Sequence, residues 1–219
     1  MRRRVVVTGM GSVSPLGNTF NETWEALLAG KSGAGPITLF DASHHKTRFA
    51  CEVKNFDAAA LFGGREARRM DRYCQFALAA ALEAVGQARL EVSDTNRDRI
   101  GVLVGTGIGG IGTLVEQIEV LREKGPERVS PFLVPMMIAD SAAAVIAIRL
   151  GVRGPNAAFV TACATGSNAI GEAAEMIRRG AADVMLAGGA EASIVSVAMA
   201  GLNVMNGYSR GEPITCFMP

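Results

Sequence analysis

The chain alternates short apolar runs with longer stretches in which apolar residues recur every three or four positions. Short apolar runs bounded by glycine or polar residues are typical of buried strands. Four such runs fall at residues 5–8, 100–104, 157–161 and 184–187. We therefore predict four strands, the first of which ends at Gly9.

Helical periodicity fills much of the chain between these runs. Thr19 followed by Glu22 has the spacing of a capping box, which starts a helix that Gly30 ends. The other predicted helices cover residues 67–88, 114–121, 138–150 and 168–179. Residues 40–56 show no clear period and are predicted to be irregular or an edge strand. Because strands and helices alternate, we predict an α/β fold with a largely parallel sheet.

Composition and charge narrow the class of protein. The chain has 219 residues, of which 49% are hydrophobic and 20% are charged, so it can bury a core. Its net charge of +1 predicts no general attraction to nucleic acid or membranes. No apolar run reaches the roughly 18 residues that a membrane helix needs. The arginines at positions 2–4 lead straight into a short strand rather than a signal sequence, so we expect a cytoplasmic protein.

Cys163 is the strongest candidate for chemistry. It lies in a run of small residues, 161–166, between a predicted strand and a predicted helix. A thiol at the start of a helix feels the positive end of the helix dipole, which favours the nucleophilic thiolate. The alternative is a buried structural cysteine, which the residue taken alone favours. The chain has no C-x-x-C spacing and no zinc or disulfide framework among Cys51, Cys74, Cys163 and Cys216.

Residues 105–110 read Gly-Thr-Gly-Ile-Gly-Gly and match the G-x-G-x-x-G pattern of dinucleotide-binding loops. The dinucleotide-binding fingerprint also requires an acidic residue at the end of the next strand. The acids at the right distance, Glu119 and Glu123, lie instead on the predicted helix. The pattern therefore favours a tight, closely packed turn over a nucleotide site.

Two charged or polar clusters have alternative interpretations. A cluster of arginines follows helical spacing and forms either an ordinary solvated surface or a basic patch for an acidic partner. Its members are Arg65, Arg68, Arg69 and Arg72, with Glu66 and Asp71 among them. His44 and His45 have no cysteine or acid at ligand spacing, so they are predicted to lie in a polar loop rather than a metal site.

Several motifs in order resemble one enzyme family. The chain resembles the β-ketoacyl-acyl-carrier-protein synthases from its first strand to about Met205, and the type II branch in particular. The motifs that carry this resemblance are at residues 5–17, 105–110, 130–135, 161–166 and 183–191.

This resemblance implies a fold and a reaction. The fold would be thiolase-like, with this chain as the N-terminal half of a duplicated five-layer α/β architecture. The reaction would be a decarboxylating Claisen condensation of acyl and malonyl thioesters on acyl-carrier protein, in fatty acid elongation. Cys163 would be the acylated nucleophile, and its backbone N–H would donate to the oxyanion. No cofactor is implied, and relatives are homodimers.

The resemblance also assigns binding residues. Ile108 matches a residue that lines the acyl pocket. Leu202 falls where relatives often have phenylalanine. Arg65, Arg68 and Arg69 match the basic patch that docks acyl-carrier protein.

The resemblance stops short of a complete enzyme. Residues 1–205 are predicted to form the thiolase-like domain, and 206–219 an atypical tail, as a truncation or frameshift would produce. Relatives carry two catalytic histidines in a second half, whereas this chain has only His44 and His45. We therefore expect the isolated chain to be inactive in condensation and to need a complementary half. The alternatives are a non-catalytic module that binds carrier protein or a partner subunit and, more remotely, a nucleotide-binding oxidoreductase.

Overall fold

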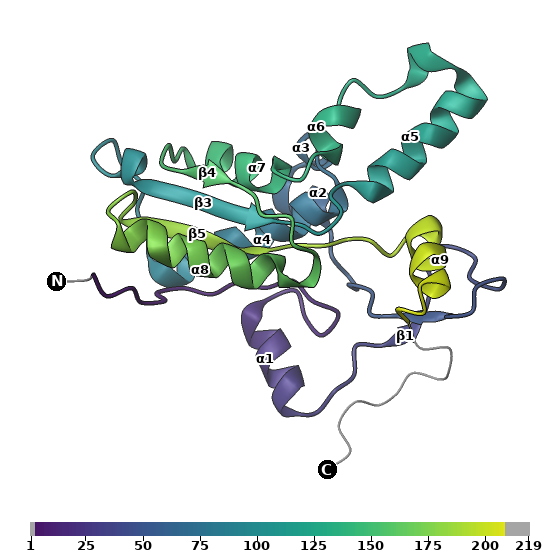
Figure 1. Cartoon of the computed structure of the whole chain (residues 1–219), viewed down its shortest axis with the longest axis horizontal. Coiled ribbons are helices and arrows are strands. Elements are labelled where there is room, and N and C mark those ends of the chain that lie inside the picture. Colours follow the sequence, from purple (N-terminus) through teal and green to yellow (C-terminus); the bar gives the residue numbers. More distant parts are fainter. Residues whose placement is uncertain (1–2, 209–219) are drawn as a thin grey trace.

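The computed structural model describes residues 3–208 (Figure 1). Within them, three parallel strands form the central sheet in the order β4-β3-β5. These strands are β3 (Ile100–Gly105), β4 (Asn156–Ala157) and β5 (Val184–Gly189). All six residues of β3 are buried, which explains why its sequence is continuously apolar.

The helices, in chain order, are α1 (Phe20–Leu28), α2 (Ala58–Phe62), α3 (Gly64–Ala67), α4 (Arg72–Ala88), α5 (Ile111–Lys124), α6 (Leu133–Met137), α7 (Ser141–Leu150), α8 (Thr165–Arg178) and α9 (Ser196–Val204). Short 3-10 turns and a two-stranded hairpin complete the elements: η1 (Arg97–Arg99), η2 (Pro126–Arg128), η3 (Ala162–Ala164), β1 (Gly35–Pro36) and β2 (Phe49–Ala50).

Helices cover both faces of the central sheet. On one face α7 packs against β3 and α4 packs against α7, while α8 packs on the other face against β3 and β5 (Figure 1). Ile100, Val102 and Val104 belong to the core on the α4 and α7 side. Successive side chains of a strand point to opposite faces, and Leu103 accordingly packs on the α8 side. The predicted α/β class with a parallel sheet is confirmed.

The predicted first strand is wrong. Residues 5–8 pair with no strand among the described residues, and Val6 and Val7 are exposed. The chain that follows lies on α4 instead, where Gly9 and Gly11 allow backbone to meet helix backbone. Polar groups of α4 hold it there: Glu83 and Gln87 accept hydrogen bonds from backbone N–H groups of this segment. The segment after the apolar run is therefore held by α4, while Val6 and Val7 remain exposed outside the sheet.

The predicted helix over residues 67–88 is divided in two. Asp71 interrupts it by capping α4, since its carboxylate accepts from the Tyr73 backbone N–H at 3.1 Å. The same carboxylate accepts from the Thr113 hydroxyl at 2.6 Å and from its N–H at 3.1 Å. Asp71 is only 4% exposed. One buried side chain therefore starts α4 and ties it to the first turn of α5.

One cap differs in detail and two other boundaries shift. Thr19 caps α1 as predicted, but the Glu22 carboxylate accepts from the backbone N–H of Asn18 rather than from that of Thr19. The strand predicted over residues 157–161 pairs only at its start, as β4. The helix predicted over residues 138–150 begins later, at Ser141, after the separate helix α6.

From the body of the protein, α5, η2 and α6 project as an arm (Figure 1). Gly125, with φ of +82°, ends α5, and the three residues of η2 turn the chain back. Ser130 follows this turn, and its N–H donates to the Gln117 side chain at 2.7 Å. The arm is thus closed on itself at its far end and anchored by Asp71 at its base.

Candidate active site

Cys163 lies in η3, which runs directly into α8. Its side chain is exposed. The first N–H groups of a helix have no partner within the helix, so this end of α8 offers hydrogen-bond donors and a positive dipole. The structure therefore has the strand, turn and helix order that the sequence predicts, with α8 starting at Thr165, three residues earlier than expected.

The turn that carries the thiol is held in a strained conformation. Ala162 has φ of +50°, a left-handed value that non-glycine residues rarely adopt. The N–H of Thr161 donates to the Thr165 hydroxyl at 2.9 Å, and its carbonyl accepts from Ala164 at 3.1 Å. Asn168 donates to the Thr161 hydroxyl at 3.1 Å. These bonds fix the backbone around Cys163, since such strain persists only where the surroundings enforce it.

Residues 105–110, here called the glycine loop, join β3 to α5 and lie against this turn. A Cβ atom on Gly107 would stand 3.5 Å from the Cα of Ala162. The loop amides already have partners within the protein. Gly107 donates to the Glu191 carboxylate at 2.8 Å and Gly109 to the Thr106 hydroxyl at 3.2 Å. A pyrophosphate would have to displace a carboxylate here, which speaks against the nucleotide-binding interpretation.

Two further residues belong to this neighbourhood, and sequence reasoning missed their role. Glu191 follows β5 and reaches the glycine loop. Burial raises the pKa of the Tyr208 phenol, and electrostatic interaction with Cys163 and Glu191 raises it further. Tyr208 therefore lies near both groups. Glu191 closes the 183–191 motif, and that was the only signal in the sequence for it.

The two predicted acyl-pocket residues occupy different elements. Ile108 is on the glycine loop beside the Cys163 turn and is 50% exposed. Leu202 is half-buried on α9. That helix is anchored to the segment around the β1–β2 hairpin, because Thr47 donates to the buried Asn203 side chain at 2.8 Å. The structure thus places Ile108 on the loop that contacts the Cys163 turn and Leu202 on α9.

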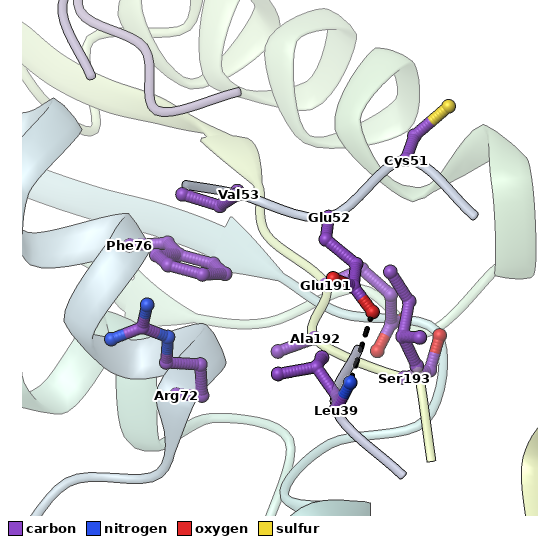
Figure 2. Close-up of a pocket in the computed structure, with 10 residues that line it drawn as sticks. Leu39, Cys51, Glu52, Val53, Arg72, Phe76, Glu191, Ala192 and Ser193 are labelled. Carbon is purple, nitrogen blue, oxygen red and sulfur yellow. Dashed lines mark hydrogen bonds between the residues drawn. The ribbon is translucent and has the colours of Figure 1, made fainter. Parts of the chain in front are cut away.

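A pocket of about 250 Å³ adjoins the site through Glu191. Figure 2 shows Phe76 and Arg72 on one side and Glu52 and Glu191 on the other, with the Cys51 sulfur pointing away. Burial alone would raise the pKa of Glu52, but hydrogen bonds from Thr38 and Leu39 lower it overall. The remaining lining is mainly apolar: Leu39, Val53, Ala192 and Ile194.

The basic cluster lies on and just after α3. Arg65, Arg68 and Arg69 are all exposed. The Arg69 guanidinium stands over the Phe132 ring, 4.7 Å from its centre, whereas Glu66 pairs with Arg149 at 3.2 Å rather than with the cluster. The cluster therefore presents positive charge to solvent.

The histidines lie in a loop between β1 and β2. His45 Nε2 is 3.1 Å from the Ser196 hydroxyl, and its ring is tilted against Phe40. Within residues 3–208 no group of three or more histidine, cysteine or acidic side chains is arranged to hold a metal ion. The same part of the chain contains no helix that is both long and apolar enough to cross a membrane. Cys216 and most of the predicted tail lie outside the described residues.

Comparison with known proteins agrees with this geometry. The family model "Beta-ketoacyl synthase, N-terminal domain" matches residues 2–219. The 3-oxoacyl-[acyl-carrier-protein] synthase 2 of Synechocystis is 50% identical over 200 residues, which are 91% of this chain and 48% of that protein. Its counterpart in Staphylococcus aureus is 48% identical over 212 residues, 97% of this chain and 51% of that protein. The chain thus spans about half the length of these relatives.

Solved structures show the same similarity. A β-ketoacyl synthase from Burkholderia phymatum has a TM-score of 0.83 at 28% identity and covers all of this chain and 54% of its own. The ishigamide ketosynthase/chain length factor has a TM-score of 0.81 at 35% identity over 94% of this chain and 51% of its own. A ketosynthase in complex with its type II PKS acyl-carrier protein has a TM-score of 0.79 at 25% identity over 94% of this chain and 55% of its own. The chain belongs to the β-ketoacyl synthase family, whose N-terminal domain it matches, and it has the thiolase-like fold.

Proposed function

We propose that this chain supplies the nucleophile of a type II β-ketoacyl-acyl-carrier-protein synthase, which elongates fatty acids by decarboxylating Claisen condensation. The observation that carries this proposal is the exposed Cys163 thiol at the start of α8, in a turn held by its own hydrogen bonds. A structural cysteine would need neither exposure nor a strained, fixed turn.

In the first step, Cys163 Sγ attacks the carbonyl carbon of an acyl thioester. The S–C bond forms, the carrier-protein thiolate leaves, and it takes up the proton given up by Cys163. The N–H of Cys163 donates to the oxyanion of the tetrahedral intermediate, where a fixed donor stabilises developing charge. In the second step, malonyl thioester loses carbon dioxide and its carbanion attacks the carbonyl carbon of the acyl-enzyme. The C–C bond forms, the S–C bond to Cys163 breaks, and the Cys163 thiolate leaves, which releases the β-ketoacyl thioester and regenerates the nucleophile.

The second step requires catalytic groups in addition to Cys163. The family resemblance assigns the stabilisation of the carbanion to two histidines in a second half. The two histidines of this chain are in the loop near α9, and one of them is bonded to Ser196. We infer that the isolated chain acylates itself but does not condense.

Carrier protein is the proposed partner of the basic cluster. Arg65, Arg68 and Arg69 are exposed together, and opposite charge mainly accelerates encounter. A structural neighbour was solved with its own acyl-carrier protein bound, which supports this partner. Carrier-protein binding without catalysis is the second candidate function, and the cluster alone would serve it.

Two further partners fit exposed surfaces. β4 is at the edge of the sheet within the described residues, so it can pair with a second copy in a homodimer. The outer side of α8 exposes Ile170, 56% accessible, and can be covered by a complementary half like that of the longer relatives.

Incubation of the chain with an acyl thioester of acyl-carrier protein, with and without malonyl-acyl-carrier protein, tests the proposal. Intact-mass spectrometry detects acylation of the chain, and product analysis detects any β-ketoacyl thioester. We expect addition of one acyl group, lost in Cys163→Ser and retained in Cys51→Ser, together with no β-ketoacyl product. Binding of carrier protein without any acylation of Cys163 would favour the non-catalytic module. Condensation by the chain alone would contradict the assigned need for a second half.

A further inference from the structure

We propose that Glu191 is a positioning residue that fixes the front half of the glycine loop against the Cys163 turn and thereby limits the length of the chain that Cys163 accepts. This inference rests on the proposed function for its biological meaning, but its geometry is independent of it. The carboxylate binds the loop at two points, the Gly107 N–H at 2.8 Å and the Thr106 hydroxyl at 3.3 Å.

The two halves of the glycine loop are held from different sides. The rear half is bonded to the end of α6, because the Gly110 N–H donates to the Met137 carbonyl at 3.0 Å. The Thr106 hydroxyl accepts from Gly109 at 3.2 Å, but that bond lies within the loop and does not anchor it. Glu191 ties the front half to the chain that follows β5. The Ala190 N–H also holds the first residue of the loop, because it donates to the Gly105 carbonyl at 3.0 Å. Loss of Glu191 would therefore release Gly107, the loop residue that lies against Ala162.

The fit around Gly107 is close. A Cβ atom at this position would stand 2.8 Å from Glu191 Oε2 and 3.5 Å from the Cα of Ala162. The loop is thus held between the carboxylate and the turn of the nucleophile. Bonds to an ionised carboxylate are shorter and stronger than those between neutral groups. Ile108, the next residue, is half-exposed and lacks burial of its own to hold it, so the bond at Gly107 determines its position.

Glu191 also lines the 250 Å³ pocket (Figure 2). Its carboxylate therefore separates the mainly apolar pocket from the glycine loop. Removal of this side chain would both loosen the loop that carries Ile108 and connect the pocket to the space beside Gly107. Both effects favour longer alkyl groups at Cys163.

Two probes test this, one of which requires no enzymatic activity. N-ethylmaleimide and N-dodecylmaleimide alkylate Cys163, and peptide mass spectrometry gives the rate for each. In Glu191→Ala we expect the ethyl-to-dodecyl rate ratio to fall by about tenfold or more, because the variant loses both bonds to the carboxylate, at Gly107 and at Thr106. Glu191→Gln should restore most of the wild-type ratio, because the amide oxygen still accepts from both donors, although without the added strength of a charged acceptor. Glu172→Ala, which removes an exposed ion pair with Arg179 on α8, is the matched control.

Hydrogen exchange supplies a readout that a general loss of stability would not imitate. In Glu191→Ala, exchange should accelerate in the peptide that contains residues 105–110 and remain unchanged in β3 and α8. If that variant does not fold, the same two measurements are made on Glu191→Asp. Its shorter side chain cannot reach both donors, so we expect the same direction of change. An unchanged alkylation ratio with unchanged loop exchange would overturn the proposal, and so would a ratio that Gln fails to restore.

Acylation by C8 and C16 acyl-carrier protein thioesters separates this inference from the proposed function. If wild-type Cys163 accepts neither thioester while the maleimide ratio responds to Glu191, the positioning role stands and the proposed function fails. If acylation occurs with the same length preference in wild type and Glu191→Ala, the positioning role fails alone.

Discussion

Three cysteines within the described residues occupy very different environments. Cys74 is buried in α4, and burial raises its pKa to about 12. At pH 8 only about one in 10⁴ of such thiols is ionised, so Cys74 is inert. Cys51 and Cys163 are both exposed, but only Cys163 lies at the start of a long helix. Exposure and helix dipole together, rather than exposure alone, distinguish the proposed nucleophile.

Limited alkylation with iodoacetamide at pH 8 should therefore label Cys163 first, Cys51 more slowly and Cys74 only after unfolding. We expect the Cys163 rate to exceed that of Cys51 by about threefold or more, in line with the modest effect of a helix dipole. Peptide mapping of partially labelled folded protein measures this, and Cys163→Ser should leave the Cys51 rate unchanged. Faster labelling of Cys51 than of Cys163 would contradict the dipole argument.

At the residue scale, local chemistry was predictable and long-range contacts were not. The cap at Thr19 and the turn around Cys163 follow from neighbours in the sequence. The bonds of Glu191 and Asp71 join residues that are 84 and 42 positions apart, respectively. No spacing rule connects such pairs, so the sequence contained no signal for either bond.

At the scale of elements, α3 and the start of α4 decide how the basic cluster is displayed. Because Asp71 interrupts the helix, Arg65 and Arg68 lie on a separate short helix and its end. Arg69 differs from them, since its guanidinium stacks on Phe132. A test of charge alone should therefore leave Arg69 in place.

Reversal of charge in Arg65→Glu with Arg68→Glu should weaken association with acyl-carrier protein, mainly through a slower on-rate. We expect about a tenfold or greater loss at low ionic strength and a smaller difference at high salt, because salt screens exposed charges. Surface plasmon resonance at two salt concentrations measures both.

The matched control is Arg4→Glu with Arg153→Glu. Both arginines are exposed near the amino ends of the strands, where the Arg153 N–H donates to the Arg97 carbonyl just before β3. An equal loss of affinity in this control would show that net charge, not the cluster, attracts the carrier protein.

Element prediction succeeded where burial was uniform and failed where a helix competed with the sheet. The run at residues 100–104 is buried on both faces and became β3. The run at residues 5–8 has the same apolar character but stays outside the sheet and leads into residues 9–12, whose backbone donates to Gln87 and Glu83 of α4. Periodicity cannot distinguish these two outcomes, because both begin with the same kind of short apolar run.

For the whole molecule, the central sheet and the helices on its two faces form three layers. The outer surfaces of these layers include exposed apolar side chains. Five of the 17 residues of α4 are buried. In contrast, α8 exposes Ile170, and Val160, between β4 and Cys163, is exposed as well, each 56% accessible. Exposed apolar surface of this kind favours association.

Light scattering should therefore give a mass above the 22.9 kDa of one chain, as a dimer or larger species. Co-expression with the second half of a longer relative, such as the Staphylococcus aureus synthase, should reduce aggregation by covering α8. Ile170→Lys should shift the population towards monomer, because it places a charge on the exposed side. A monodisperse monomer with a cooperative melt would rule out the need for any covering partner.

The buried Asp71 also gives the projecting arm a mechanical property. An α-helix rises 1.5 Å per residue, so the 14 residues of α5 reach about 21 Å from their base. A rotation of about 10° at that base would displace the far end by about 4 Å. The two bonds from Thr113 to Asp71 lie at the base of α5. A small rotation of the helix at this base therefore produces the largest displacement at its far end. The position of η2 and of Arg128 within it is thus set by a carboxylate at the opposite end of the helix.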